Sequence, residues 1–278
     1  MDLHSEMSTL RTLPAIVISI AMLAAVAPDA GAQSTHASLD WNATYRWVHV
    51  DNIGPDPSAV FERARAGWLQ ALRQGDSLLA DGRPLFWSHR ARERSTYFTF
   101  YPFTRFGELD ARRDAVRATQ AAVGKDALAR YDLGDAVLVP PHYSQIWRRS
   151  PDDDYVPAGG EAWTERTAAC GWMEFRTPSF EDAAVDSLWK ELRAALAAEH
   201  YPLTCRVLQN VYGSSDIICM WLAPDSTALQ AAPRIKEVVT RHMGVVPARK
   251  FWKRLDAVFP ITSTLTVERR PELSNLGK

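Results

Sequence analysis

The same order of predicted strands and helices occurs twice along this 278-residue chain, and this internal repeat limits its fold more than any other feature. Strands are predicted where apolar and polar residues alternate, and helices where apolar residues recur every three or four positions. The first copy is predicted to contain strands at residues 45–50, 85–90, 96–101 and 143–149, a helix from 57 to 72 after the first strand, and helices at 108–122 and 126–131 before the last.

The second copy has the same β-α-β-β-α-β order. It is predicted to contain strands at residues 172–176, 206–212, 216–222 and 262–268, a helix capped by Ser179, and helices at 227–241 and 248–257. Spacing supports a duplication, because Trp68 and Trp189 lie 121 residues apart, as do the arginine pairs 148–149 and 269–270. The predicted divisions are a signal peptide at 1–32, a first unit at 33–149, a linker at 150–169 rich in Asp, Pro and Gly, and a second unit at 170–278.

A β-α-β-β-α-β unit is typical of ferredoxin-like folds, and it leaves one face of its sheet uncovered. The chain therefore resembles the dimeric α/β-barrel superfamily, as a tandem fused pair that carries no diagnostic family motif. The expected fold class is α+β, with two tandem ferredoxin-like units packed sheet to sheet as an intramolecular α/β barrel. The resemblance implies relatives as different as cofactor-free monooxygenases, haem enzymes of the chlorite-dismutase type and stress-response proteins, so it does not specify a reaction.

Alternation along the predicted strands separates the face covered by helices from the face that meets the other sheet. The residues expected to face the helices are Val48, Val50, Phe98, Phe100, Ile146, Met173 and Phe175. The opposite face is aromatic and ionisable, a mixture typical of a ligand pocket. The candidate ligand-binding residues on it are Trp47, His49, Asp51, Tyr97, Tyr101, Trp147, Arg149, Trp172, Glu174 and Arg176.

The same residues allow other interpretations. The aromatic side chains fit an inter-sheet core equally, and Arg149 with Asp51 or Glu174 with Arg176 fits a structural ion pair. His49, Asp51 and Glu174 are the types found in a metal site or around a general base, but the spacing does not complete a ligand set, so no metal is predicted. A haem iron would need an axial histidine. The histidines available are His49, His89, His142, His200 and His242, none in a recognised ligand context.

The predicted function is binding of a small ligand between the two sheets, with catalytic residues and cofactor undetermined. One alternative is an oxidative enzyme, either cofactor-free and monooxygenase-like or haem-dependent. Another is a structural or stress-response module with a filled aromatic core. No G-x-S-x-G, H-E-x-x-H or glycine-rich phosphate loop is present to indicate a hydrolase, a metalloprotease or a nucleotide-binding protein.

The N-terminal segment predicts export. Residues 13–27 form an apolar run after Arg11, and the small residues Ala30-Gly31-Ala32 follow, as in a cleavable signal peptide. Met7 offers a less acidic start than Met1. The run is too short to span a membrane, and the mature protein is expected in the periplasm or outside the cell, soluble and without a membrane anchor.

Charge and cysteine content restrict the partners. Lys+Arg is 32 and Asp+Glu 33, a net charge of -1, so no basic surplus indicates nucleic acid. A fused pair is expected to be a monomer or a weak homodimer that pairs through exposed strand edges. Cys170, Cys205 and Cys219 show no metal-binding spacing, and the sequence leaves open whether two of them form a disulfide.

Overall fold

The computed structural model describes residues 42–54, 58–74, 86–126, 129, 132, 137–158, 167–176, 183–211 and 216–275. All of them belong to the second of two compact units, 1–35 and 36–278. The predicted signal peptide at 1–32 and the predicted cap Ser179 lie outside the described residues. None of the described helices is long and apolar enough to cross a membrane.

Eight antiparallel strands form a closed barrel in the order β1-β3-β2-β8-β5-β7-β6-β4. The strands are β1 Tyr45–Asn52, β2 Trp87–Ala91, β3 Thr96–Phe103, β4 Tyr143–Arg149, β5 Ala169–Arg176, β6 Thr204–Asn210, β7 Asp216–Ala223 and β8 Ile261–Arg269. Each predicted strand is present, and the two halves of the chain join through β2 with β8 and β4 with β6. Because the barrel closes, none of these eight strands has the open edge expected to pair two molecules.

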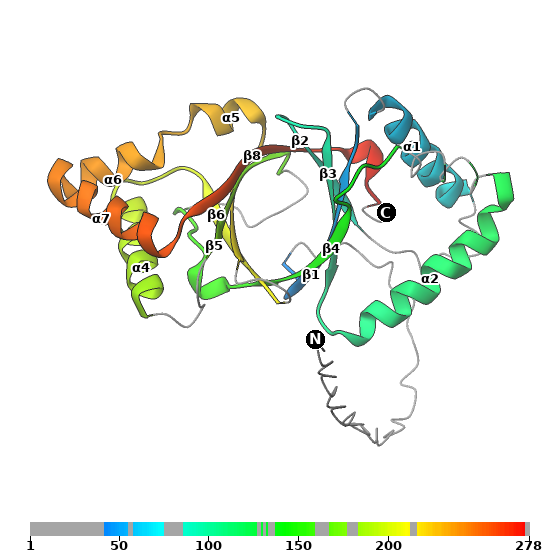
Figure 1. Ribbon diagram of the computed structural model, residues 1–278, viewed down its shortest axis with the longest axis horizontal. Helices are drawn as coiled ribbons and strands as arrows, with labels where there is room; N and C mark the ends of the chain where they lie inside the picture. The colour runs from blue at the N-terminus through cyan, green and yellow to red at the C-terminus, as the bar shows by residue number, and fades with distance from the viewer. Residues whose placement is uncertain are drawn as a thin grey trace, which may run out of the picture. The chain divides into compact units, whose positions relative to one another are not determined.

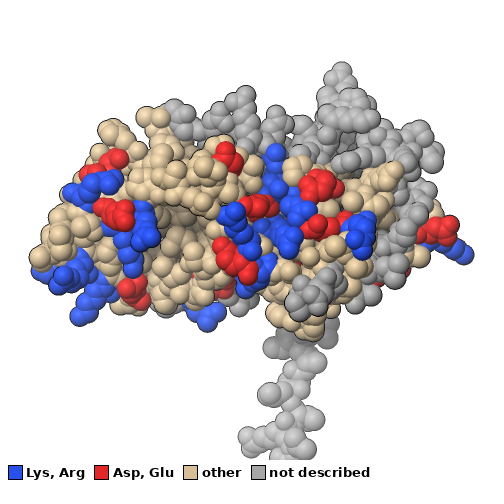
Figure 2. All heavy atoms as spheres, turned by 90° about the horizontal axis from the view of Figure 1, so that it is seen from above, with Lys and Arg blue, Asp and Glu red and all other residues tan. Residues whose placement is uncertain are grey.

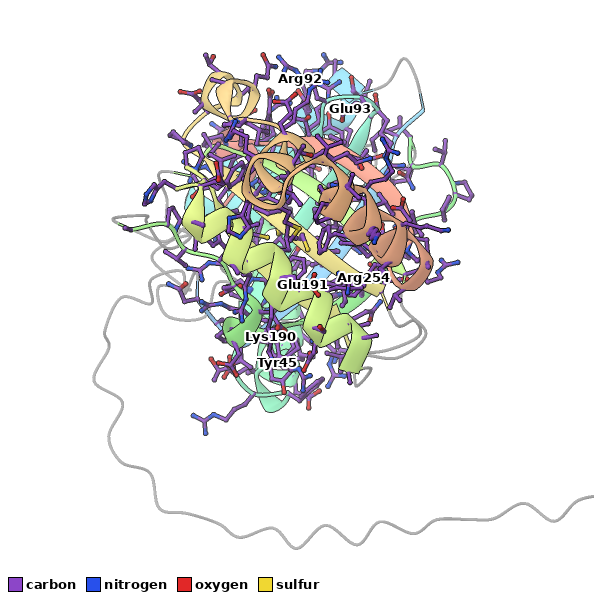
Figure 3. The ribbon with its side chains drawn as sticks, turned by 90° about the vertical axis from the view of Figure 1, so that its left-hand side faces the viewer. Tyr45, Arg92, Glu93, Lys190, Glu191 and Arg254 are labelled. Carbon is purple, nitrogen blue, oxygen red and sulfur yellow. The ribbon has the colours of Figure 1, made fainter. Side chains whose placement is uncertain are left out.

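Helices cover the barrel on two opposite sides (Figure 1). One side carries α1 Ser58–Gln74 and α2 Gly107–Val123, and the other carries α4 Ala183–Ala198, α5 Ser226–Ala231, α6 Ile235–Met243 and α7 Val245–Val258. Two guanidinium nitrogens of Arg254 on α7 lie 3.1 and 2.5 Å from the carboxylate oxygens of Glu191 on α4, which joins these helices at the surface (Figure 3). The architecture is therefore an eight-stranded closed barrel flanked by helices, the fold that the resemblance implied. On the face seen from above, basic and acidic side chains lie close to one another (Figure 2).

The predicted helix at 227–241 is two helices, α5 and α6. The break falls where Ala232 has extended backbone angles of φ -64 and ψ 140, directly before Pro233. A proline ring disfavours helical angles at the residue before it, and its missing N–H interrupts the helical hydrogen bonds. The strand and helix predictions on either side are confirmed.

Packed side chains fill the inside of the barrel. Fifteen buried residues from both halves form this core: Val48, Val50, Trp87, Ala91, Phe98, Phe100, Trp147, Cys170, Trp172, Leu208, Ile218, Met220, Leu222, Leu265 and Val267. A second and larger core lies between the sheet of the second half and its helices, where Phe175, Trp189, Val239 and Phe251 are buried. The region between the two sheets, where the ligand was expected, thus contains this packed cluster.

The face assignment was wrong for β1 and β3, and right for Ile146 and Trp147 of β4 and for the second half. Val48, Val50, Phe98 and Phe100 point into the barrel rather than toward the helices, and the alternate residues of β1 and β3 therefore lie under α1 and α2. In the second half, Trp172 lies inside the barrel and Phe175 packs toward the helices, as predicted. The closed barrel has a narrow interior, which suits valine and flat aromatic rings that interdigitate.

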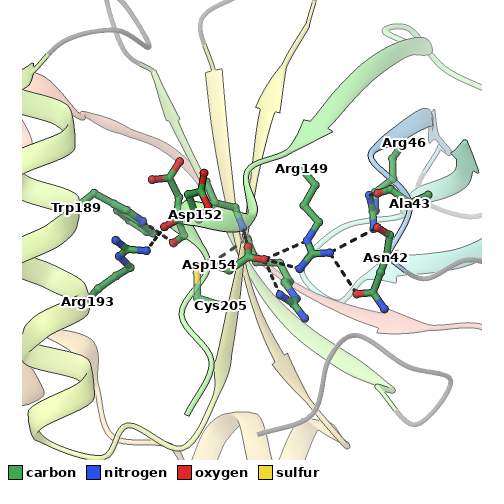
Figure 4. Close-up of polar contacts among 12 residues, drawn as sticks. Asn42, Ala43, Arg46, Arg149, Asp152, Asp154, Trp189, Arg193 and Cys205 are labelled. Carbon is green, nitrogen blue, oxygen red and sulfur yellow. Dashed lines mark hydrogen bonds and ion pairs between the residues drawn. The ribbon is translucent and has the colours of Figure 1, made fainter. Parts of the chain in front are cut away.

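The first part of the predicted linker is packed against the barrel (Figure 4). Asp154 accepts hydrogen bonds from Arg149 at 2.8 Å and Arg206 at 2.5 Å, and its other oxygen accepts from the Val207 backbone N–H at 2.9 Å. Tyr155 bridges to Cys205 through paired backbone hydrogen bonds. Residues 151–158 therefore join β4 to β6, while 159–166 lie outside the described residues.

Candidate functional site

A buried carboxylate lies under α1, on the outer face of the first half of the barrel. The Asp51 side chain is 0% exposed, and its Oδ2 is 2.9 Å from Nη2 of Arg65, which α1 supplies. Its Oδ1 is 3.0 Å from Nε2 of His49 and 3.6 Å from Nδ1 of His142. Burial raises the pKa of Asp51, but its contact with His49 and the charge of Arg65 lower the pKa more, so the carboxylate stays ionised.

His49 connects this carboxylate to a surface hydroxyl. Its Nδ1 is 2.8 Å from Oγ of Ser144, because β1 and β4 pair with His49 opposite Ser144. Its other nitrogen faces Asp51, two residues along the same strand and therefore on the same face. Ser144, His49 and Asp51 thus form a continuous polar chain from the protein surface to a buried charge.

A cavity of about 650 Å³ lies between α2 and the outer face of β1 and β4, and Ser144 is part of its wall. That volume is within the range of small-molecule sites. Trp47, Leu109 and Ile146 give the cavity apolar surface. The polar residues that line it are Asp110, Arg112, Arg113, Arg117, Gln120, Ser144 and Gln145. Among the described lining residues, three arginines lie beside the carboxylate of Asp110, which pairs with Arg113 at 3.2 Å. Asp114 lies 4.0 Å from both Arg113 and Arg117, so Arg112 is the arginine of the wall without a carboxylate partner among the described ion pairs.

Arg112 is the most enclosed cation of the cavity wall. Its Nη2 donates to the backbone carbonyl of Pro102 at 2.9 Å, and its guanidinium lies 5.0 Å from the ring centroid of Tyr101. Its Nη1 is buried without a hydrogen-bond acceptor. Burial lowers the pKa of Arg112 and raises that of Tyr101. Trp47 stacks on Tyr101 with ring centroids 4.9 Å apart, so an aromatic wall continues from the cavity toward Asp51.

The structure divides the ten predicted site residues into two groups. Trp47, His49, Asp51, Tyr97 and Tyr101 lie together on the outer face under α1 and α2. Tyr97 belongs to a neighbouring network, in which its hydroxyl donates to Glu62 at 2.5 Å and Arg270 holds the same carboxylate at 2.5 and 2.9 Å.

The other five do not join this site. Trp147 and Trp172 are buried in the barrel core. Arg149 pairs with Asp154 rather than with Asp51. Arg176 pairs with Asp216, at 3.4 Å, rather than with Glu174. Burial, and then the charge of Asp216, raises the pKa of Glu174.

Sequence reasoning missed Arg65, Arg112 and Ser144, and it considered His142 only as a haem ligand. One signal for Arg65 was available, since it lies four residues after Phe61 and four before Leu69 and therefore on the buried face of its helix. A charge in an apolar stripe indicates a buried partner. Ser144 and His142 reach His49 and Asp51 only through the register of β4 on β1 and the chain before it, which no single-sequence pattern specifies.

The histidine expected as an axial ligand for haem iron is not found at either described cavity. A second cavity of about 420 Å³ lies between the sheet of the second half and α5 to α7, lined largely by apolar residues that include Phe175, Trp189, Trp221 and Trp252. No histidine is among the described residues that line these cavities. Among the histidines proposed, His89 is buried in the barrel, where burial and the charge of Arg269 lower its pKa to about 3. The described residues of these two cavities therefore do not supply the axial histidine expected for haem.

Comparison with known proteins finds distant structural likeness. No family model and no curated protein matches the chain. An anthrone oxidase-like protein is 13% identical with a TM-score of 0.48, over 82% of this chain and 92% of its own. A chlorite dismutase mutant from Candidatus Nitrospira defluvii is 13% identical with a TM-score of 0.47, over 83% and 92%. An encapsulated DyP-type peroxidase from Mycobacterium smegmatis is 7% identical with a TM-score of 0.48, over 81% and 92%. The assignment of the fold rests on the strand order of the barrel.

Proposed function

We propose that this protein is an enzyme that binds a small organic anion, or a molecule that becomes one, in the cavity under α2, and removes a proton from it through Ser144 and His49. The observation that carries the proposal is the chain from Ser144 in the cavity wall to His49 and on to the fully buried Asp51. A cavity with a base at its wall is the minimum that proton abstraction needs.

The proton would move in two linked steps. The hydroxyl of Ser144 gives its proton to Nδ1 of His49, 2.8 Å away, and takes the substrate proton in exchange. His49 becomes an imidazolium, and Asp51 stabilises that charge at 3.0 Å from Nε2. Arg65 holds the other oxygen of Asp51, so the carboxylate is fixed in place during the transfer.

The cavity wall favours a substrate whose negative charge grows as the proton leaves. Arg112, Arg113 and Arg117 stand on one face of α2 and supply positive charge, while Trp47 and Ile146 supply flat and apolar surface. A buried guanidinium with a free donor, such as Nη1 of Arg112, stabilises a developing oxyanion more strongly than a solvated one. An aromatic hydroxyl or an enol satisfies both demands.

Proton removal in this cavity would be the first step of the cofactor-free, monooxygenase-like activity that the sequence allowed as an alternative function. A phenolate or enolate produced in the cavity is electron-rich and is the species that a reaction with O₂ would consume.

We also propose that the barrel consists of two tandem ferredoxin-like units, which the matching orders β4-β1-β3-β2 and β8-β5-β7-β6 support. Export of the mature chain is a further proposal, supported by the apolar run at 13–27 and the small residues at 30–32.

The test uses 5-nitrobenzisoxazole, a small aromatic probe that opens to a phenolate when a base removes one proton. We expect the full chain to accelerate this elimination, and His49→Gln to reduce the rate by about 10²–10⁴-fold, the range of a positioned general base. His242→Gln, an exposed histidine on α6, is the matched control and should retain the full rate.

Equal rates in the two variants would overturn the proposal. A second probe, 4-nitrophenyl acetate, separates the base from a nucleophile. An initial burst of 4-nitrophenolate with an acetyl group on Ser144, detected by mass spectrometry, would identify Ser144 as a nucleophile and would contradict proton abstraction as the role of this chain.

A further inference from the structure

We infer that Nε2 of His49, Nδ1 of His142 and Oδ1 of Asp51 form a binding site for a divalent transition-metal ion of the zinc class. The three atoms come from β1 and from the segment that leads into β4, so the barrel itself brings them together. The inference is independent of whether the proposed proton transfer occurs.

The spacing of the donor atoms fits a single ion. All three lie within 4.8 Å of one another, with 3.0 Å from His49 to Asp51 and 3.6 Å from His142 to Asp51. Zinc binds histidine nitrogen and carboxylate oxygen at about 2.0–2.2 Å, so two of its ligands at a tetrahedral angle lie roughly 3.4 Å apart. Small rotations of the two imidazole rings would bring the nitrogens to these distances.

The orientation of the groups also favours an ion. Oδ1 of Asp51 is fully buried, and no N–H points at it well enough to make a hydrogen bond, although Nε2 of His49 is only 3.0 Å away. Leaving a buried carboxylate oxygen without a donor costs free energy. A bound ion would satisfy this oxygen together with the two imidazole nitrogens that lie within 4.8 Å of it.

The outer contacts match those that support a metal site. Arg65 holds Oδ2 of Asp51 at 2.9 Å and leaves Oδ1 available. Ser144 lies 2.8 Å from Nδ1 of His49, where it would accept that N–H and fix the ring with Nε2 toward the ion. The His142 side chain is 51% exposed, so the site opens to solvent and leaves room for water or another ligand as the fourth donor.

Binding an ion here would occupy the atoms that the proposed proton transfer uses. A metal on Nε2 of His49 requires the proton on Nδ1, whereas proton abstraction requires Nδ1 to be free to accept. An ion at this site should therefore inhibit the elimination reaction, and this inhibition is a second way to detect metal binding.

The test is titration of the untagged full chain with ZnCl₂ by calorimetry, and with CoCl₂ by visible absorption. We expect one ion per chain with the absorption bands of four-coordinate cobalt. Loss of a residue that only supports a metal ligand typically weakens metal affinity about 10–100-fold. His142 would be a direct ligand, so replacing it with alanine should weaken the zinc affinity by at least that factor. His142 is half exposed, so the variant should fold, and equal urea midpoints would verify this. His242→Ala is the matched control and should bind as the unaltered chain does.

Equal zinc affinities in His142→Ala and His242→Ala, or no binding to the unaltered chain, would overturn the metal site. The zinc titration and the elimination assay test the metal site and the proposed function separately. Zinc binding that depends on His142 without any elimination activity supports the metal site and refutes the base, whereas activity without such binding does the reverse.

Discussion

Replacing Arg65 with methionine should destabilise the protein far more than replacing a surface arginine, because Asp51 would keep a charge with no full counter-charge. The Asp51 side chain is 0% exposed and that of Arg65 only 14%, and their closest atoms are 2.9 Å apart. The guanidinium of Arg65 lies 5.0 Å from the ring centroid of Phe61. Methionine keeps a stem of similar length and apolar character to that of arginine, so the change removes charge more than packing.

The expected cost follows from this burial. Removing one partner of a buried ion pair costs about 3–5 kcal/mol, because the remaining charge is neither solvated nor paired. His49 stays 3.0 Å from Oδ1, so Asp51 keeps one polar neighbour and the expected loss is near the lower end, about 3 kcal/mol. Adding Asp51→Asn removes the stranded charge, so the double variant should recover part of that loss.

Urea denaturation of the unaltered chain, both single variants and the double variant gives this coupling directly. Arg113→Met is the matched control, since Arg113 is 59% exposed and its loss should cost less than about 1 kcal/mol. A loss below about 1 kcal/mol for Arg65→Met, or costs that simply add in the double variant, would refute the account of Asp51 as a buried and paired charge.

Three further outcomes are expected. Trp147→Ala should lower the free energy of unfolding by about 3–5 kcal/mol in urea, because Trp147 is 1% exposed inside the barrel; a loss under 1 kcal/mol would show that the interior is not packed as described. Glu174→Gln should raise the Tm at pH 7. Burial raises the pKa of Glu174, so its charge opposes folding at neutral pH; the gain should disappear below about pH 4.5, and a lower Tm at pH 7 would contradict this. All three cysteines are buried and free, so a thiol reagent should react only after unfolding in urea; fewer than three reactive thiols then would reveal a disulfide.

The order and position of the strands could be predicted from the sequence, but the direction of the faces of β1 and β3 could not. Alternation separates the two faces of a strand but does not say which face points into the barrel. In β1, valine lies on one face and aromatic or ionisable residues lie on the other. Valine fits beneath a helix or inside a narrow barrel equally well, so the alternation alone did not decide. In the second half, Phe175 and Met173 pack toward the larger apolar core, which made the same pattern decisive.

The candidate site was predictable only in part, for a related reason. His49 and Asp51 share a strand, and strand periodicity alone places them together. Ser144 joins them through the pairing of β1 with β4, and Arg65 through the docking of α1. These contacts join residues 95 and 14 positions apart, and their register depends on the closed barrel rather than on local sequence.

The central claim is that the cavity under α2, and not the barrel interior or the second cavity, receives the ligand. A fluorescence titration with 8-anilinonaphthalene-1-sulfonate, an aromatic anion, tests it most directly when Ile146→Trp fills the cavity under α2 and Leu229→Trp fills the second one. The account predicts that Ile146→Trp raises the Kd at least about tenfold, a loss of 1.4 kcal/mol, while Leu229→Trp binds as the unaltered chain does. Loss of binding in Leu229→Trp alone, or equal binding in both variants at equal urea midpoints, would contradict it.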